Sequence, residues 1–256
     1  MKRSIVVVAI AAVIGFGAPN AQAAPLSCFG KAPTIVGTPG RDILIGTDGP
    51  DVIMGLGGSD YINGRGGRDL ICGGRGDDGS FTPSRGDGGL HGGLDVDKIR
   101  GGRGNDEVNG GSDTSSSSDP GSADFLYGGP GDDHICDNAC SHNSYQMVDT
   151  GDDRLFGGRG NDILSSTGGD DHQFGDRGDD RLGRQLFCSE SSCVEEEITV
   201  DTGADSYFGG EGKDSITVSD GVEGNDSIDG GADTDDCTAD PEDAVIDCES
   251  SIRSAS

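Results

Sequence analysis

Apolar residues recur along this chain at intervals of nine, each placed two residues after an aspartate. Residues 37–81 divide into five consecutive windows: GTPGRDILI, GTDGPDVIM, GLGGSDYIN, GRGGRDLIC and GGRGDDGSF. Each window has Gly at positions one and four and Asp at position six, and all but the last have an aliphatic residue at position eight. A fixed short period of this kind indicates a repeat architecture.

The pattern within one window predicts a turn followed by a very short strand. Glycines at positions one and four allow positive φ and a tight turn. The ending, with one aliphatic residue between two others, predicts a strand with a single inward side chain. Turn, strand, turn and strand make one coil every eighteen residues, so turns two windows apart stack on one edge. The predicted fold is all-β, a parallel β-roll or β-helix solenoid.

The aspartates at position six are the candidate metal ligands. Carboxylates and the exposed carbonyls of Gly-rich turns are hard oxygen donors, which suit Ca²⁺. Asp42 and Asp60 are eighteen residues apart, and so are Asp51 and Asp69, which predicts that each pair lies one coil apart. The candidate residues are Asp42, Asp51, Asp60, Asp69, Asp78, Asp97, Asp106, Asp124, Asp133, Asp153, Asp162, Asp171, Asp180, Asp205, Asp214, Asp226 and Asp235.

These windows resemble the calcium-binding nonapeptide repeats of RTX (repeats-in-toxin, haemolysin-type) proteins, GGxGxDxUx, in which U is aliphatic. The resemblance covers most of residues 37–235. It implies a parallel β-roll in which Ca²⁺ is held between stacked turns by the Asp and by turn carbonyls. Many relatives are exported by a C-terminal signal, whereas this chain begins with an N-terminal one. We therefore do not carry over the toxin or protease activity of those relatives.

Three interruptions divide the predicted roll, at 82–91, 137–147 and 184–199. We interpret them as surface insertions, which solenoids accommodate readily. Residues 24–36 are expected to form an irregular lead-in, and 236–256 a disulfide-closed C-terminal cap over the last coil.

The serine-rich window GGSDTSSSS at 110–118 resembles a linker in composition but is nine residues long. Asp124 therefore stays eighteen residues from Asp106, and we interpret the window as a degenerate repeat that keeps the coil. Additional acids at position five, Asp152, Asp170 and Asp179, are expected to be solvated and not to face an ion.

Composition argues against an ordinary hydrophobic core. Hydrophobic residues make up 31% of the chain, Trp is absent, and 47 acidic residues against 18 basic ones give a formal net charge of −29. Such a composition is typical of disorder unless a cation neutralises the clustered carboxylates. The same charge argues against nucleic acid and anionic membranes as partners.

The N-terminus has the pattern of a cleaved signal peptide over residues 1–23. Lys2 and Arg3 precede an apolar run at 5–18, and Ala-Gln-Ala at 21–23 is a small-residue cleavage site. The run is too short to span a membrane, and no second one follows. We expect secretion, with an uncleaved signal acting as a membrane anchor as the alternative.

Eight cysteines, all beyond residue 23, fit an oxidising compartment. Three pairs are close in sequence, namely Cys136/Cys140, Cys188/Cys193 and Cys237/Cys248, which leaves Cys28 and Cys72. The connectivity stays open at this point. A zinc site is the alternative, but the chain has no CxxC pairs.

Motifs of the enzymes that often carry such repeats are absent. None of the four histidines lies in HExxH, and no GxSxG occurs. A GxGxxG match at 74–79 is a by-product of the repeat, because it lacks the flanking strand and helix of a dinucleotide site. We therefore expect a calcium-binding protein and no enzyme. The alternatives are a calcium-rigidified scaffold for a cell-surface or envelope partner, and a hydrolase that uses the insertions.

Overall fold

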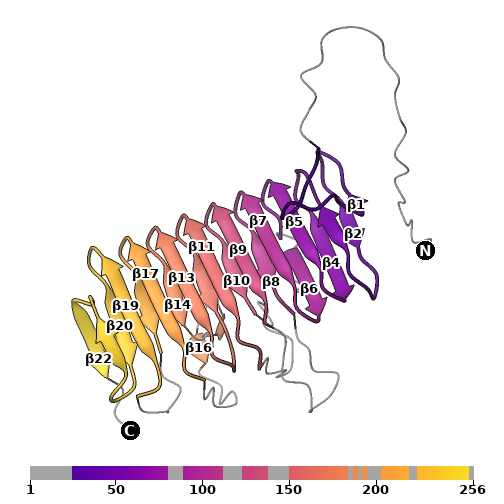
Figure 1. Cartoon of the computed structure of the whole chain (residues 1–256). Helices are drawn as coiled ribbons and strands as arrows, with labels where there is room; N and C mark the ends of the chain where they lie inside the picture. Colours follow the sequence, from indigo (N-terminus) through magenta and orange to yellow (C-terminus); the bar gives the residue numbers. More distant parts are fainter. Residues whose placement is uncertain are drawn as a thin grey trace, which may run out of the picture.

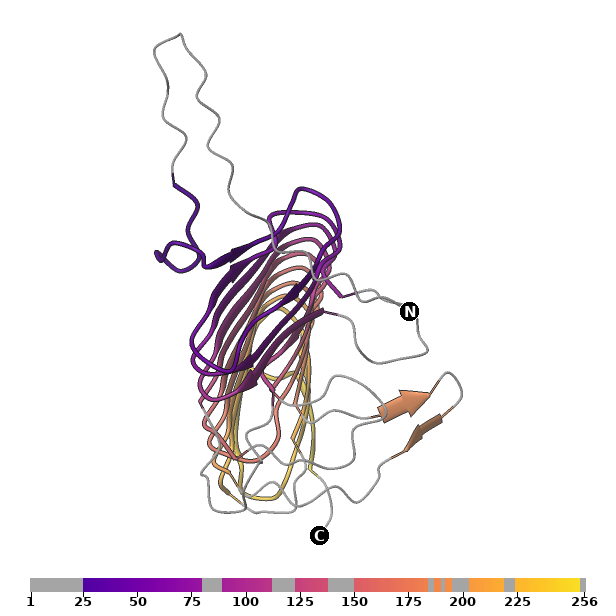
Figure 2. The same cartoon turned by 90° about the vertical axis from the view of Figure 1, so that its right-hand side faces the viewer.

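The computed structural model describes residues 25–79, 89–111, 123–137, 150–183, 187–189, 192–194, 203–218 and 224–253. These residues form strands and turns, with no helix among them. Two parallel ten-stranded sheets face each other along an elongated solenoid (Figure 1). Figure 2 shows the successive coils stacked behind one another around a narrow interior. The all-β, parallel β-roll architecture expected from the repeat is confirmed.

The first sheet contains, in order, β1 (Ile35–Val36), β3 (Val52–Met54), β5 (Leu70–Arg75), β7 (Lys98–Arg103), β9 (Phe125–Pro130), β11 (Arg154–Arg159), β13 (His172–Arg177), β17 (Ser206–Glu211), β19 (Ser227–Ala232) and β21 (Ala244–Ile246). The second contains β2 (Ile43–Ile45), β4 (Tyr61–Gly66), β6 (Gly89–Leu94), β8 (Glu107–Asn109), β10 (His134–Cys136), β12 (Ile163–Ser165), β14 (Arg181–Gly183), β18 (Ser215–Thr217), β20 (Asp236–Ala239) and β22 (Ser250–Arg253). A separate antiparallel pair is formed by β15 (Phe187–Ser189) and β16 (Ser192–Val194).

The turns define two edges of the roll. Turns that lead from the first sheet to the second lie along one edge, called the upper edge after its place in Figure 1. Turns that lead back lie along the opposite, lower edge. Position six of successive windows therefore alternates between the two edges.

The core is one side chain thick on each side. Position-eight residues of neighbouring coils lie in register, as in Ile53, Ile71 and Ile99, and all three are fully buried. Positions seven and nine point outward, so that Ile43 is 67% exposed. The inward assignment of position eight is confirmed, and it explains how so few apolar residues can build a core.

The fifth window differs from the expected pattern. Leu90 pairs with Ile62, is fully buried and occupies position eight of this window. The last three residues of the expected insertion at 82–91 are therefore not part of a loop, because residues 89–91 are the first three residues of β6. Ser80, which occupies position eight when the windows are counted in sequence, lies outside the described residues.

The serine-rich window also differs from its expected role. Leu126, two residues after Asp124, lies beside Ile99 in the first sheet, and one lower-edge turn connects Gly110 to Asp124. The eighteen-residue spacing between Asp124 and Asp106 is therefore coincidental, since these residues lie on opposite edges. The extra nine residues lengthen a turn, and residues 112–122 lie outside the described part.

The two sheets extend into both terminal segments. β1 lies within 24–36, and β21 and β22 lie within 236–256. In the C-terminal segment Val245 packs against the core, so this cap continues the coil instead of covering it with another fold.

Disulfides link Cys28 to Cys72 and Cys237 to Cys248. Cys136 is also disulfide-bonded, and its expected partner Cys140 lies outside the described residues. Cys188 and Cys193 lie opposite each other in the β15–β16 pair. The described residues include no helix that is long and apolar enough to cross a bilayer.

Candidate metal centre

All seventeen predicted aspartates lie in two ladders of main-chain to side-chain hydrogen bonds. In each ladder the N–H of one Asp donates to Oδ1 of the corresponding Asp one coil later, for example Asp60 to Asp78 at 2.9 Å. The upper-edge ladder contains Asp42, Asp60, Asp78, Asp106, Asp133, Asp162, Asp180, Asp214 and Asp235. The lower-edge ladder contains Asp51, Asp69, Asp97, Asp124, Asp153, Asp171, Asp205 and Asp226.

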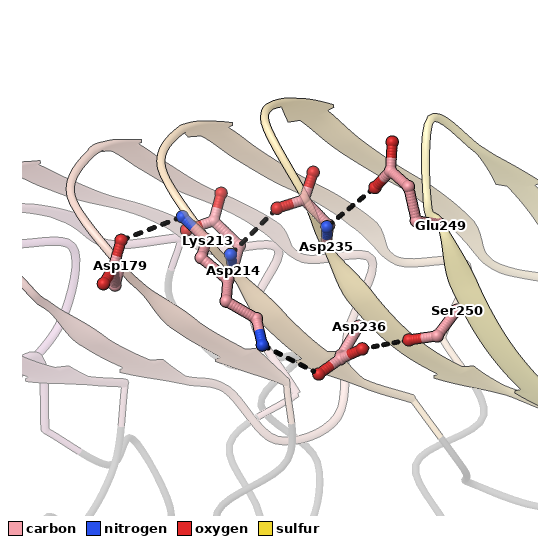
Figure 3. A network of polar contacts seen from close by, with 7 residues as sticks. All are labelled: Asp179, Lys213, Asp214, Asp235, Asp236, Glu249 and Ser250. Atoms are coloured by element: carbon pink, nitrogen blue, oxygen red, sulfur yellow. Dashed lines mark hydrogen bonds and ion pairs between the residues drawn. The ribbon is translucent and has the colours of Figure 1, made fainter.

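Each ladder ends on an acid that the sequence analysis missed. The N–H of Asp235 donates to Glu249 Oε2 at 2.8 Å, where the longer side chain replaces another aspartate (Figure 3). On the lower edge, Asp226 donates to Asp243 Oδ1 at 3.4 Å. The sequence did contain a signal for Asp243, because residues 243–246 have the Asp-x-aliphatic-x ending of a repeat window.

The second oxygen of these carboxylates has a different environment. Oδ2 is buried and accepts no hydrogen bond from the described residues in Asp60, Asp69, Asp78, Asp106, Asp133, Asp162, Asp171, Asp180, Asp214 and Asp235. A buried acceptor without a partner is costly. A row of such oxygens at equivalent positions points to a ligand that the protein itself does not supply.

Position one of the repeat forms a cradle beside this oxygen. A Cβ added to Gly55 would lie 2.3 Å from Asp60 Oδ2 and 2.6 Å from the carbonyl oxygen of Gly73, one coil later. The same arrangement recurs at Gly128 with Asp133 and the Gly157 carbonyl. Gly at position one is therefore required for space, and it does not adopt the positive φ that the sequence suggested.

Positive φ occurs at positions two and four of the turn. Gly74 and Gly76, at positions two and four of one turn, have φ of 124° and 112°. At position two some turns place a non-glycine residue in this region, such as Leu56 at 82° and Arg65 at 84°. Position four is also tightly stacked, because a Cβ on Gly131 would lie 1.9 Å from the carbonyl oxygen of Gly104. In each turn, main-chain carbonyl oxygens of the adjacent coil thus lie close to the glycines, and this arrangement repeats from coil to coil.

Burial perturbs the carboxylates strongly. Burial raises the pKa of Asp60 to about 6, of Asp78 to about 7 and of Asp106 and Asp162 to about 8. The ladder hydrogen bond lowers each pKa, and neighbouring carboxylates raise it again. The ion-free roll therefore disfavours the charged form of these groups, which a bound cation would favour.

The first aspartate of each ladder receives hydrogen bonds to Oδ2 from a threonine of its own turn. Asp42 Oδ2 accepts hydrogen bonds from Thr38 N and Oγ1 at 2.6 and 2.9 Å. Asp51 Oδ2 accepts the same pair from Thr47 at 2.7 and 2.9 Å. Threonine at position two, where later turns have Gly or another residue, thus satisfies the carboxylate at the N-terminal end of each ladder.

Acids at position five are exposed and form bridges of their own. The N–H of Asp170 donates to Asp152 Oδ1 at 3.0 Å, and that of Lys213 donates to Asp179 Oδ1 at 2.9 Å (Figure 3). In these bridges the later residue is the donor, opposite to position six. Besides being solvated as expected, these acids link successive coils.

The donor set fits a hard cation bound partly by main-chain oxygens. Among the described residues no three His, Cys, Asp or Glu side chains converge on a common point. An ion beside Asp60 Oδ2 would therefore need carbonyl oxygens such as that of Gly73, in addition to carboxylates. Such oxygen-only coordination suits Ca²⁺, which accepts six to eight oxygens in flexible geometry.

Comparison with known proteins identifies the repeat. The family described as RTX calcium-binding nonapeptide repeat (4 copies) matches residues 45–79, 86–115, 121–136, 148–182 and 218–243, more than half of the chain. All the ladder aspartates except Asp42, Asp205 and Asp214 lie within these segments. Comparisons with curated proteins and with solved structures gave no match. The RTX nonapeptide repeats bind Ca²⁺, and this chain belongs to that family.

Proposed function

We propose that this protein is a secreted calcium-binding roll that folds when Ca²⁺ binds between its stacked turns. The observation that carries the proposal is the row of buried Oδ2 atoms without hydrogen bonds along the upper edge. The residues that would hold the ions are Asp60, Asp78, Asp106, Asp133, Asp162, Asp180, Asp214 and Asp235, together with Asp69 and turn carbonyls. Bound Ca²⁺ would supply positive charge and ligand bonds, and the proposal includes no catalytic step.

Charge makes folding depend on the ion. The chain carries a formal −29, and the ladders stack carboxylates one coil apart along both edges. The core contributes only one inward side chain per strand, which offsets little chain entropy. Cation binding would remove the repulsion and desolvation of the carboxylates, so that binding energy becomes folding energy.

The proposed location follows from calcium supply and from the N-terminus. RTX repeat proteins are typically extracellular, and extracellular calcium modules have dissociation constants on the order of 10⁻⁴–10⁻³ M. Residues 1–23, which have the signal-peptide pattern, lie outside the described residues. We infer that the chain stays unfolded inside the cell, is exported with cleavage of this segment and folds outside.

Circular dichroism of the mature chain, titrated with Ca²⁺ from a chelated start, tests the proposal. We expect a disordered spectrum in chelator and a cooperative gain of β signal on addition of millimolar Ca²⁺. Mg²⁺ serves as the control and should fail, because it demands octahedral geometry and keeps its waters. A β spectrum that persists in excess chelator, with disulfides reduced, would contradict calcium-coupled folding. Equal affinity for both ions would contradict the proposed sites.

A second candidate function is a calcium-rigidified scaffold for a cell-surface or envelope partner. It is favoured by the outer face of the first sheet, where Tyr127, Phe156, Phe174 and Phe208 stack at centroid distances of 4.8–4.9 Å. Lys98 lies over the Tyr127 ring at 5.4 Å from its centroid. Binding of the purified protein to cells and envelope fractions, with and without Ca²⁺, tests this function. Absence of binding in Ca²⁺ would count against it.

A further inference from the structure

The two edges of the roll differ at position one. Each of the nine upper-edge turns that carry a ladder Asp has Gly there, five residues before the Asp. These glycines are Gly37, Gly55, Gly73, Gly101, Gly128, Gly157, Gly175, Gly209 and Gly230. The cradle beside Oδ2 is therefore free of side-chain atoms from position one in these nine turns.

Among the described turns of the lower edge, the first four have this glycine, at Gly46, Gly64, Gly92 and Gly110. The residues that follow β10, β12 and β18 are Asp137, Ser166 and Val218, and the equivalent residue of β20 is its last one, Ala239. All four are buried. Val218 and Ala239 belong to the hydrophobic core. The residue that follows β14 lies outside the described part. In these four distal turns position one thus carries a buried side chain.

At Asp171 a polar network replaces the usual repeat residues. Ser166 stands at position one and Gln173, fully buried, at position eight. Gln173 Nε2 donates to Ser166 Oγ at 2.8 Å, and the N–H of Gly183 donates to Gln173 Oε1 at 2.9 Å. Among the described residues none donates to Asp171 Oδ2 within hydrogen-bond distance, but the Ser166 hydroxyl interacts with this carboxylate.

At Asp205 the protein itself supplies a donor. Tyr207, buried at position eight, donates its hydroxyl to Asp205 Oδ2 at 3.0 Å. Gln173 and Tyr207 lie side by side on β13 and β17, so two adjacent coils carry polar groups where the rest of the core is largely aliphatic. In the turn that leads to Asp226, the residue that follows β18 is Val218, whose side chain offers no oxygen.

From these contacts we propose that the distal lower edge does not bind calcium. Asp171, Asp205 and Asp226 are structural members of the ladder, whereas Ca²⁺ occupies the Gly-lined turns. This inference rests on the proposed calcium-binding function and refines where the ions bind. The N-terminal turns provide an internal precedent, because Thr38 and Thr47 satisfy Oδ2 of Asp42 and Asp51 with protein donors.

The chemical reason is competition for one small space. A Cβ at position one of an upper-edge turn would lie as close as 2.2 Å to the ladder Oδ2, as it would at Gly73 beside Asp78. A residue with a side chain at this position therefore displaces either the carboxylate or an ion. A hydroxyl that donates to Oδ2, as Tyr207 does, already occupies a lone pair that a cation would use.

Matched Asp→Asn substitutions on the two edges test the inference. Asn keeps the Oδ1 acceptor of the ladder but removes the negative charge. Asp171→Asn and Asp205→Asn are compared with Asp180→Asn and Asp214→Asn, each nine residues further along the chain. Bound calcium is measured by equilibrium dialysis with atomic emission, and the Ca²⁺ midpoint of folding by circular dichroism.

We expect the upper-edge variants to lose bound calcium and to fold at several-fold higher Ca²⁺. The lower-edge variants should bind as many ions as the parent, with an unchanged midpoint. Loss of bound calcium in Asp171→Asn or Asp205→Asn would overturn the inference while leaving the proposed function intact. A parent protein that binds no calcium would refute the proposed function itself.

A gain-of-site variant gives an independent readout if a lower-edge variant fails to fold. Ser166→Gly combined with Gln173→Leu restores the repeat pattern at Asp171. This double variant should bind more calcium than the parent in the same dialysis experiment. A calcium content equal to the parent's would contradict the role assigned to these two side chains.

Discussion

The main-chain N–H of Asp78 donates a hydrogen bond to Oδ1 of Asp106 at 2.9 Å, although 28 residues separate them. Asp60 and Asp78 make the same bond across 18 residues. Ten extra residues are therefore accommodated between Asp78 and Leu90 without a break in the ladder. Register in this roll is set by the stacked turns and not by the length of chain between them.

Deletion of residues 79–88 should consequently leave the fold intact. The deletion joins Asp78 to Gly89 and creates the window GGRGDDGLH, with Leu90 at position eight. We expect an unchanged Ca²⁺ midpoint and an unchanged thermal midpoint in Ca²⁺ within a few degrees, since about 1 kcal/mol corresponds to roughly 2–4 °C in a chain of this size. Deletion of residues 90–99 is the control of equal length. It removes Leu90 and Ile99 from the core and should abolish the β signal.

The cradle at position one predicts a large effect from one methyl group. Gly55→Ala places Cβ at 2.3 Å from Asp60 Oδ2, so the variant should need more Ca²⁺ to fold and bind fewer ions. Gly49→Ala is the matched control, because nothing lies within 4 Å of its added Cβ and its φ is not positive. This control should match the parent or gain about 0.4–1 kcal/mol in stability. Equal calcium titrations for the two variants would refute the cradle.

Without calcium, acid should stabilise the roll. Burial raises the pKa of Asp60, Asp78 and Asp106 from 3.8 to about 6, 7 and 8. A carboxyl whose folded pKa is raised binds more protons in the folded state, so its contribution is present at low pH and is lost as pH rises through the folded pKa. In chelator we therefore expect the β signal in circular dichroism to increase as the pH is lowered from 8 to 5.

With calcium the sign should reverse, because protons compete with the ion for the same carboxylates. The Ca²⁺ midpoint should therefore rise as pH falls below about 8, the raised pKa of the upper-edge residues Asp106 and Asp162. Circular dichroism at fixed pH with and without chelator measures both effects. A chelated sample that loses β signal on acidification from pH 8 to pH 5 is the contrary result.

The Cys28–Cys72 disulfide holds the N-terminal segment against the outer face of the first sheet. Its sequence separation is 44, and Phe29 beside it packs on Tyr127 at 6.0 Å between ring centroids. Replacing both cysteines by Ala should lower the free energy of unfolding in Ca²⁺ by about 4 kcal/mol, from loop closure in the unfolded chain. Urea denaturation at saturating Ca²⁺ measures the loss. An unchanged urea midpoint would show that the segment is held by packing alone.

The repeat allowed the two sheets, the buried row and the stacking of aspartates along two edges to be predicted, because Asp at position six and an aliphatic residue at position eight impose a single register. The hydrogen bonds between successive aspartates were not predicted. Counting residues gave wrong assignments where extra residues lengthen a turn without changing the register of the strands. Leu90 was missed because Ser80 falls at position eight by counting, whereas packing selects the apolar residue. Asp124 was paired with Asp106 because counting cannot tell a lengthened turn from an additional half-coil.

The role of position one was not predictable from residue type. Glycine is compatible both with positive φ and with close packing, and only the structure shows that Gly55 is needed for space. The two polar core residues, Gln173 and Tyr207, also depart from the aliphatic pattern at position eight. Their partners Ser166 and Asp205 can be identified only once the turns are stacked.

The direction of the ladder hydrogen bonds gives the roll a polarity along its length. At position six the earlier coil supplies the N–H and the later coil supplies the carboxylate, on both edges. The C-terminal end of any partly built roll therefore displays amide donors, and its N-terminal end displays acceptors. A chain that leaves the cell with its N-terminus first would present each new carboxylate to donors already in place. Coils can therefore be added in order from the N-terminus, because each folded coil exposes the amide donors that bind the carboxylate of the next.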